Sequence, residues 1–230
     1  MKTMLAAVVA LCGATTVQAE SVNLMLTSTG NGRIVRATIG STNFTVFAGR
    51  LNHAVNGNLA NQMVTFRTDI LQGCSAASSS FTRTQLAQLS GNGGATNVGY
   101  AKAQAIADIV AAAAGRQLTL GHDYATAFQV AVWEIVYDFN GNVPGRNLNI
   151  AGGTFKAASQ DGSALSASIM EKVSFLLGSI GTNASGQYIR SYRSVGFADQ
   201  FSVVPIPTSA YLGLAGLGLA AVIRRHMKRR

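Results

Sequence analysis

The spacing of apolar and polar positions changes twice along this chain. Residues 20–71 contain short β-branched and aromatic runs separated by Gly, Asn and Ser, as in GRIVRATIG and MVTFRTDI. Alternation with a period of two is typical of half-buried strands, so we expect β-hairpins here. The stretch YIRSYRSVGFADQFSVV, residues 188–204, alternates in the same way. It predicts a closing strand that pairs with the N-terminal sheet.

Between these regions the apolar spacing becomes that of helices. We predict helices over residues 100–115, 124–139 and 163–180, each with glycine at or just beyond its end. Residues 73–94 are rich in Ser, Thr, Asn and Gly, which predicts an exposed loop with a short helical turn at RTQLAQL. The whole pattern predicts one α+β domain over residues 20–204, a β-sandwich or barrel-like sheet with a helical insertion.

The second predicted helix carries a carboxamide among its apolar residues. At 100° per residue, Gln129 lies on the same face as Val132, Trp133 and Val136. A buried carboxamide without partners costs about 1–3 kcal/mol, so its position indicates either hydrogen bonds to backbone or a chemical role. Glu134 and Asp138 point the other way, and we expect them on a solvated face.

The two ends of the chain have the composition of targeting segments. Residues 1–19 contain a basic residue, an apolar run and then Val17-Gln18-Ala19, the layout of a secretory signal peptide cleaved before Glu20. A lipoprotein signal acylated at Cys12 is disfavoured, because Leu11 stands where a small residue is expected. Export would therefore leave Cys74 as the single cysteine, with no internal disulfide.

At the other end, Pro205-Ile206-Pro207 precedes an uncharged run over residues 208–223. The strongly apolar part, Ala210–Ile223, is 14 residues long, or about 21 Å as a helix against a hydrocarbon core of about 30 Å. We expect transient membrane insertion through residues 208–223. The basic residues that follow would stay on the cytoplasmic side: Arg224, Arg225, Lys228, Arg229 and Arg230.

The net charge of +9 comes mostly from these segments. Without Lys2 and the five basic residues of the C-terminus, 12 of the 18 basic residues remain against 9 acidic ones, or +3. The remaining basic residues do not cluster as in a nucleic-acid-binding surface, so nucleic acid is excluded as a partner.

No motif of the domain predicts a catalytic or metal site. His122-Asp123 stands where a helix begins, and Asp123 suits the cap and first turn. A metal site would also need ligands that the spacing does not supply. No serine stands in a nucleophile-elbow pattern, and Asn183-Ala184-Ser185 is a glycosylation sequon by pattern only. We expect no cofactor, no metal and no enzymatic activity.

The C-terminal segment resembles the PEP-CTERM sorting signal, in which a proline-bounded tripeptide precedes a short apolar helix and a cluster of arginines. Ile206 replaces the usual acidic middle residue of the tripeptide. The resemblance covers residues 205–230. It implies an exosortase-type membrane protease as a partner and delivery of the protein to the outside of the cell.

A second resemblance lies inside the domain. TFRTDILQ, followed by AFQVAVWEIVYD, is similar to the thioester-type domains of bacterial surface proteins. In that family, a strand cysteine and a helix glutamine form a thioester that acylates amines. Gln129 and Trp133 match the helix half, whereas Arg67 follows Phe66 where the cysteine would stand. The resemblance therefore implies a degenerate site of Arg67, Gln129, Trp133 and Cys74.

In this site we expect the Arg67 guanidinium to donate a hydrogen bond to the carbonyl oxygen of Gln129. The alternative is that Cys74 serves as the nucleophile. If the strand continued through residue 74, the thiol would lie about 23 Å further along and on the opposite face, so that only a sharp turn at Gly73 could return it.

These features predict an exported bacterial protein of the cell envelope, cell surface or extracellular matrix, acting in attachment or matrix organisation. Exopolysaccharide or neighbouring surface proteins are the expected partners. The alternatives are an exported hydrolase or carbohydrate-binding module, which would need a pocket with convergent titratable groups, and a plain membrane-anchored envelope protein.

Overall fold

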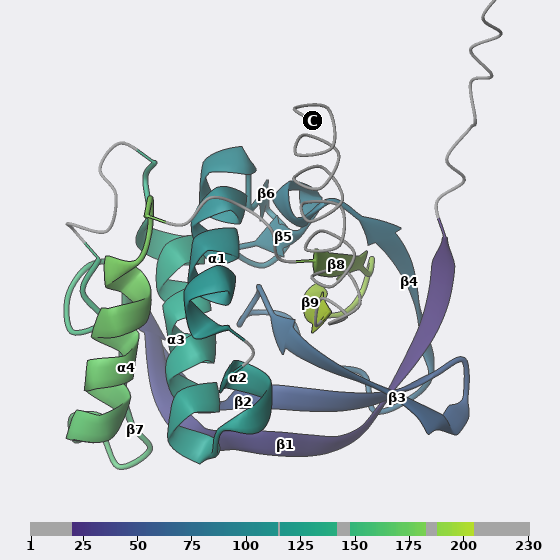
Figure 1. Cartoon of the computed structure of the whole chain (residues 1–230), viewed down its shortest axis with the longest axis horizontal. Coiled ribbons are helices and arrows are strands. Elements are labelled where there is room, and N and C mark those ends of the chain that lie inside the picture. The colour runs from purple at the N-terminus through teal and green to yellow at the C-terminus, as the bar shows by residue number, and fades with distance from the viewer. Residues whose placement is uncertain (1–19, 115, 142–147, 183–187, 205–230) are drawn as a thin grey trace, which may run out of the picture.

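The computed structural model describes residues 20–114, 116–141, 148–182 and 188–204 (Figure 1). The predicted signal peptide and sorting segment lie outside these ranges. Within them, no helix combines the length and apolar character needed to cross a bilayer.

Most strands belong to one antiparallel sheet. Its members are β1 (Ser21–Ile39), β2 (Thr42–Val55), β3 (Asn58–Arg67), β4 (Ser79–Thr84), β7 (Phe155–Ser159), β8 (Tyr188–Arg193) and β9 (Gln200–Val204). Their order is β2-β3-β9-β8-β4-β1-β7, and an additional β1–β2 pairing closes six of them into a barrel. A separate two-stranded sheet joins β5 (Ser90–Gly91) to β6 (Thr96–Asn97).

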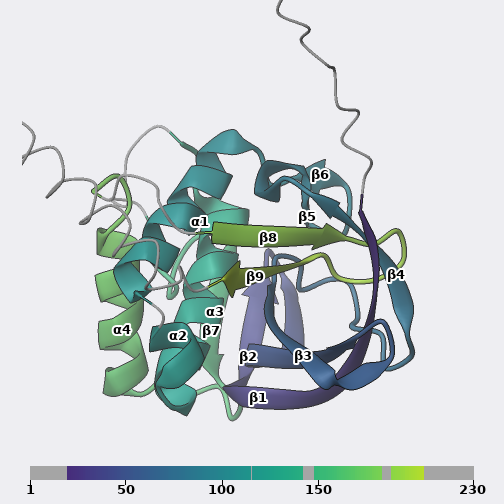
Figure 2. The same cartoon turned by 45° about the vertical axis from the view of Figure 1, so that its right-hand side comes forward.

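The 19-residue strand β1 makes this closure possible, because it pairs with β4 at its start, β2 over most of its length and β7 at its end. Its register against β2 shifts between Leu26 and Ser28 and between Thr29 and Gly32. Such irregularities bend a strand and increase its twist. The bends allow β1 to pair with both β4 and β2 and so to close the barrel (Figure 2).

The helices gather beside the barrel, with α3 in contact with β1, β2 and the neighbouring helices (Figure 1). They are α1 (Tyr100–Ala113), α2 (Arg116–Thr119), α3 (His122–Asp138) and α4 (Ala167–Gly178), and a 3-10 turn, η1 (Leu86–Gln88), precedes β5. Every residue of α3 from Tyr124 to Val136 is buried. Phe128 in α3 packs against Phe66 and Phe201, joining helix to barrel in one core.

This structure confirms the predicted fold class, a single α+β domain with a barrel-like sheet and a helical insertion. The three predicted helices are present within a few residues of the expected limits. The first one stops at Ala114, which adopts the left-handed conformation (φ 48°) expected at Gly115.

Two predictions about the strands are wrong in detail. The predicted loop over residues 73–94 contains β4, which pairs with β1 and β8 and buries Phe81. The predicted closing strand is a hairpin of β8 and β9, and its connection is held by the buried Asp199, whose carboxylate accepts from Ser194 N at 2.7 Å. Its pairing with the N-terminal sheet is confirmed, because β9 pairs with β3.

Candidate functional site

Gln129 joins the middle of α3 to the last residue of β3. Its Nε2 donates to the Arg67 carbonyl oxygen at 2.8 Å, and its Oε1 accepts from the Arg67 backbone N–H at 3.1 Å. The side chain is only 1% exposed, so the predicted burial is confirmed. A carboxamide presents the same donor and acceptor as a peptide group. Gln129 therefore continues the hydrogen bonding of β3 into the helix.

The Arg67 side chain has a different role from the one expected. Its guanidinium donates to the Phe47 carbonyl oxygen at 3.1 Å and lies over the Trp133 ring, 5.6 Å from the centroid. The predicted guanidinium contact with Gln129 is thus replaced by a contact from the Arg67 main chain. The reason is geometric, because β3 ends beside α3 with both main-chain groups of Arg67 within hydrogen-bond distance of the Gln129 carboxamide, while the guanidinium reaches Phe47 O and Trp133.

Arg67 and Trp133 form a buried cation–π pair. Arg67 is 7% exposed and Trp133 is 0% exposed. A guanidinium is always protonated and stacks well on an indole face, and a desolvated cation–π contact contributes about 2 kcal/mol. Trp133 also packs edge-on against Phe155 of β7, so the pair connects β3, α3 and β7.

Cys74 lies beside the same guanidinium. The chain leaves the strand direction at Thr68, whose backbone N–H donates to the Asp199 carbonyl oxygen at 3.1 Å, and further along Ala198 N bonds to Gly73 O at 2.9 Å. The strand ends at Arg67 and does not continue through residue 74, so the separation of about 23 Å that an extended strand would give does not arise. Instead, the half-buried thiol lies near the Arg67 side chain, whose charge partly opposes the rise in the pKa of the thiol that burial causes.

The electrostatic balance at Cys74 favours the neutral thiol. Burial raises the pKa of Cys74 above its ordinary value, and the charge of the nearby Arg67 only partly opposes this. A thiolate is the nucleophilic form of cysteine, so a raised pKa lowers its reactivity. Arg67 is therefore in contact with Gln129, Trp133 and Cys74, the other members of the predicted degenerate site, and all of the contacts described are non-covalent.

Glu134 and Asp138 do not form a solvated helix face, and this expectation is wrong. Glu134 is 0% exposed and accepts from Asn149 N at 2.6 Å. Asp138 accepts from Thr154 N and Phe155 N at 3.0 and 2.9 Å. Both carboxylates bind the segment that leads into β7, which covers the side of α3 that the helical period placed in water.

Burial has a large effect on the ionisation of Glu134. Desolvation raises the pKa of this carboxyl from 4.5 to about 8; the Asn149 N–H lowers it and the nearby charge of Asp138 raises it further. The Oε2 atom is buried without a hydrogen-bond partner among the described residues. A carboxyl group in this setting is neutral over much of the physiological pH range.

His122 and Asp123 fasten the start of α3 to β1. Asp123 accepts from Arg33 Nε at 2.8 Å, and His122 Nδ1 lies 2.8 Å from the Gly32 carbonyl oxygen. Asp123 stands in the first turn as predicted, while Gly121 occupies the cap position. Among the residues that the structure describes, no group of three or more His, Cys, Asp or Glu side chains has the arrangement of a metal site.

The predicted sorting residues, from Pro205 to Arg230, lie outside the described ranges. Sequence reasoning also missed Asp199, a fully buried carboxylate that accepts from Ser90 N at 2.6 Å as well as from Ser194 N. Its position in an alternating stretch, between Ala198 and Gln200, gave no indication of this role.

No protein-family model matches this chain, and no curated protein sequence matches it. Among solved structures, it is similar to the N-terminal thioester domain of the fibronectin-binding protein SfbI from Streptococcus pyogenes, with a TM-score of 0.38 and 10% sequence identity. The match covers 78% of this chain and 99% of that domain. A TM-score at this level is too low to assign a shared fold or function.

Proposed function

We propose that this chain is an exported bacterial protein that an exosortase-type system delivers to the cell surface or extracellular matrix, where its domain acts in attachment or matrix organisation. The observation that carries the proposal is the pairing of a signal-peptide layout over residues 1–19 with the tripeptide, apolar run and basic cluster of residues 205–230.

We further propose that the domain acts by non-covalent binding and not as an enzyme. Supporting this, its buried carboxylates are occupied in holding loops, as Glu134 holds Asn149 and Asp199 holds Ser90 and Ser194. Gln129 has both ends of its carboxamide bonded to Arg67. These groups stabilise the domain and leave recognition to its surface.

Intact-mass measurement of the protein recovered from the cells that make it tests the proposal. The expected species begins at Glu20, ends within or near Pro205–Pro207 and carries the full mass of its residues. Recovery of only the full-length tail, in washed membranes and with no shortened form outside the cell, contradicts the sorting proposal. A deficit of one ammonia, abolished by Cys74→Ala or Gln129→Ala, contradicts the non-covalent role.

A further inference from the structure

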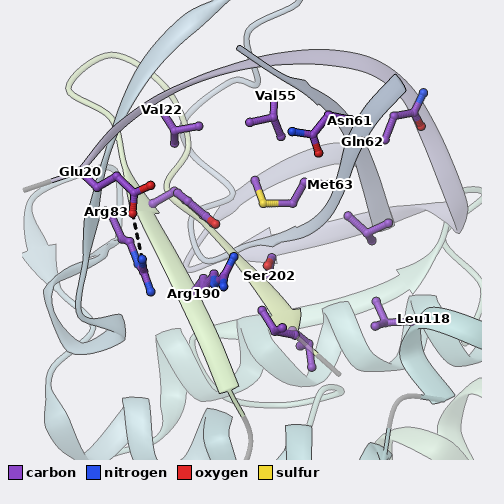
Figure 3. A pocket seen from close by; sticks show the side chains of 14 residues that line it. Glu20, Val22, Val55, Asn61, Gln62, Met63, Arg83, Leu118, Arg190 and Ser202 are labelled. Carbon is purple, nitrogen blue, oxygen red and sulfur yellow. Dashed lines mark hydrogen bonds and ion pairs between the residues drawn. The ribbon is translucent and has the colours of Figure 1, made fainter. Parts of the chain in front are cut away.

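The barrel has an opening where β3 and β9 separate. Their ladder consists of two pairs, Phe66 with Phe201 and Arg67 with Gln200. Beyond these pairs, the described part of β3 is paired only with β2, and that of β9 only with β8. Residues 61–64 of β3 and 202–204 of β9 line a cavity of about 540 Å³ between them. We call this cavity the slot (Figure 3).

The edges along the slot carry main-chain groups that have no strand partner in the described part of the chain. Backbone N–H and C=O groups need hydrogen bonds, from water or from another chain, and an open strand edge is a template for pairing. Ser202 and Val203 are buried, at 4% and 6% exposure. On the other side of the slot, Asn61 and Gln62 of β3 are exposed and Met63 and Val64 are half-buried. The strand edge that a ligand can reach is therefore that of β3.

The side chains of the slot combine an apolar floor with a cationic wall. Val22, Val55 and Met63 supply apolar surface from three strands. Arg83 and Arg190 lie on one side of the slot. Glu20 also lines the slot, and its carboxylate forms an ion pair with the Arg83 guanidinium at 2.9 Å. Figure 3 shows Met63 between Arg190 and the carboxamides of Asn61 and Gln62.

Arg190 is the lining residue whose positive charge is available to a ligand. It is exposed, and its positive charge partly opposes the rise that burial causes in the pKa of the nearby Tyr192 hydroxyl. Neither of the ion pairs formed by the described residues includes Arg190. A carboxylate entering the slot would therefore gain a charge-assisted hydrogen bond there.

We propose that the slot binds an extended, acidic peptide segment of a partner protein. The segment adds a strand to the free edge of β3 at residues 61–64, with alternate apolar side chains on Met63 and the valines and a carboxylate on Arg190. A saccharide fits this lining less well, because Tyr192, the one aromatic residue among the described residues of the lining, is buried and offers no open stacking face.

This inference rests on the proposed attachment role for its biological meaning, since attachment needs a partner. The two fail separately: binding is measured on purified protein, whereas sorting is measured on cells. If the purified protein binds peptides but the protein from cells retains residues 205–230, only the sorting proposal is contradicted.

The test is selection of a random nine-residue peptide library, displayed on phage, on the protein produced from the full chain. We expect enriched sequences with an acidic residue and alternating apolar residues. Binding of a synthetic enriched peptide should weaken at least tenfold in Arg190→Glu. The matched control is Arg193→Glu, on the same strand and also exposed but outside the slot lining, and it should keep its affinity.

Two further measurements separate strand addition from general charge attraction. The bound peptide should slow amide hydrogen exchange in residues 61–64, and N-methylation of alternate peptide bonds should abolish binding. The proposal is overturned by any of three results: an equal loss of affinity in both arginine variants, hydrogen exchange that the peptide leaves unchanged, or binding only of an acidic oligosaccharide such as oligogalacturonate.

Discussion

At the residue scale, Gln129 shows why a carboxamide can stand in an apolar helix face. It does not interrupt the core, because both of its polar atoms bond to the main chain of Arg67. These two hydrogen bonds join the end of β3 to α3, where Arg67 has no strand neighbour among the described residues on the side that faces the helix.

Replacing Gln129 with Ala should lower the free energy of unfolding by about 1–3 kcal/mol, because the N–H and C=O of Arg67 would remain buried without these partners. Urea denaturation measures the change. Gln160→Ala, at an exposed loop position, is the control and should change stability by less than about 0.5 kcal/mol. A Gln129→Ala protein as stable as the parent would mean that the hydrogen bonds between Gln129 and Arg67 contribute nothing to the free energy of unfolding.

Glu134 should make stability depend on pH. Its pKa is raised in the folded protein from 4.5 to about 8, so folding favours the protonated form. The stabilisation is complete below about pH 4.5 and is lost as the pH rises towards 8, by about 1.4 kcal/mol per pH unit within the window.

Glu134→Gln should remove this dependence, since a neutral amide can still accept from Asn149. The quantity to measure is the difference in unfolding free energy between parent and variant from pH 4 to 9. Subtraction is needed because His53, whose pKa is lowered by burial to about 4, acts in the opposite direction: its contribution is present above about pH 6.5 and is lost on acidification. Glu171→Gln, at an exposed position of α4, is the control, and a flat difference for Glu134→Gln contradicts the buried-acid account.

At the element scale, α3 is held by partners on all sides. Its first turn contacts β1 through Asp123 and His122, its middle contacts β3 through Gln129, and its last turns hold the segment before β7 through Glu134 and Asp138. A helix buried all round is the central element of a core and not a surface element.

The contact between β1 and β2 near the start of α3 requires glycine. Gly32 pairs with Gly49, and a Cβ on Gly32 would lie 2.5 Å from the Ala48 carbonyl oxygen and 2.8 Å from the Gly49 Cα. Backbone cannot yield as a flexible side chain can, so Gly32→Ala should destabilise by about 1–3 kcal/mol. Thermal unfolding measures the change.

Gly178→Ala is the matched control. A Cβ there meets nothing within 4 Å, and alanine favours helix over glycine by about 0.8–1.0 kcal/mol in a helix interior. Because Gly178 is the last residue of α4, we expect a neutral or slightly stabilising effect. Equal losses in the two variants would show that close packing at Gly32 is not the cause.

At the scale of the whole molecule, the domain and the two end segments have separate tasks in our proposal. Neutralising the basic cluster should misplace the tail and block release from the cell, because positive charge fixes the cytoplasmic side of a membrane segment. Cell fractionation with detection of the domain measures the result. The residues to replace with Gln are Arg224, Arg225, Lys228, Arg229 and Arg230.

The control replaces exposed cations of the domain, Arg36, Lys156 and Arg193, and should leave release unchanged. Release that continues after loss of the terminal cluster shows that the cluster is not recognised. Loss of release in both sets would trace the effect to total charge.

Much of the fold followed from local pattern. The helical period placed Gln129 inside, because side chains one turn apart share a face whatever packs on it. The alternation of residues 188–204 predicted pairing with the N-terminal sheet, which β9 and β3 confirm. The α+β class followed from the order of these periods along the chain.

Tertiary structure alone decided what covers each face and where the chain turns. The fold buried Glu134 and half-buried Asp138, because the segment before β7 returns over a helix face that local spacing assigns to water. It also brought Cys74 beside Arg67 through the bends that follow Thr68, and recruited β4 from a stretch with the composition of a loop. Periodicity reports the orientation of a side chain relative to its neighbours in sequence, whereas burial and proximity depend on contacts between segments far apart in the chain.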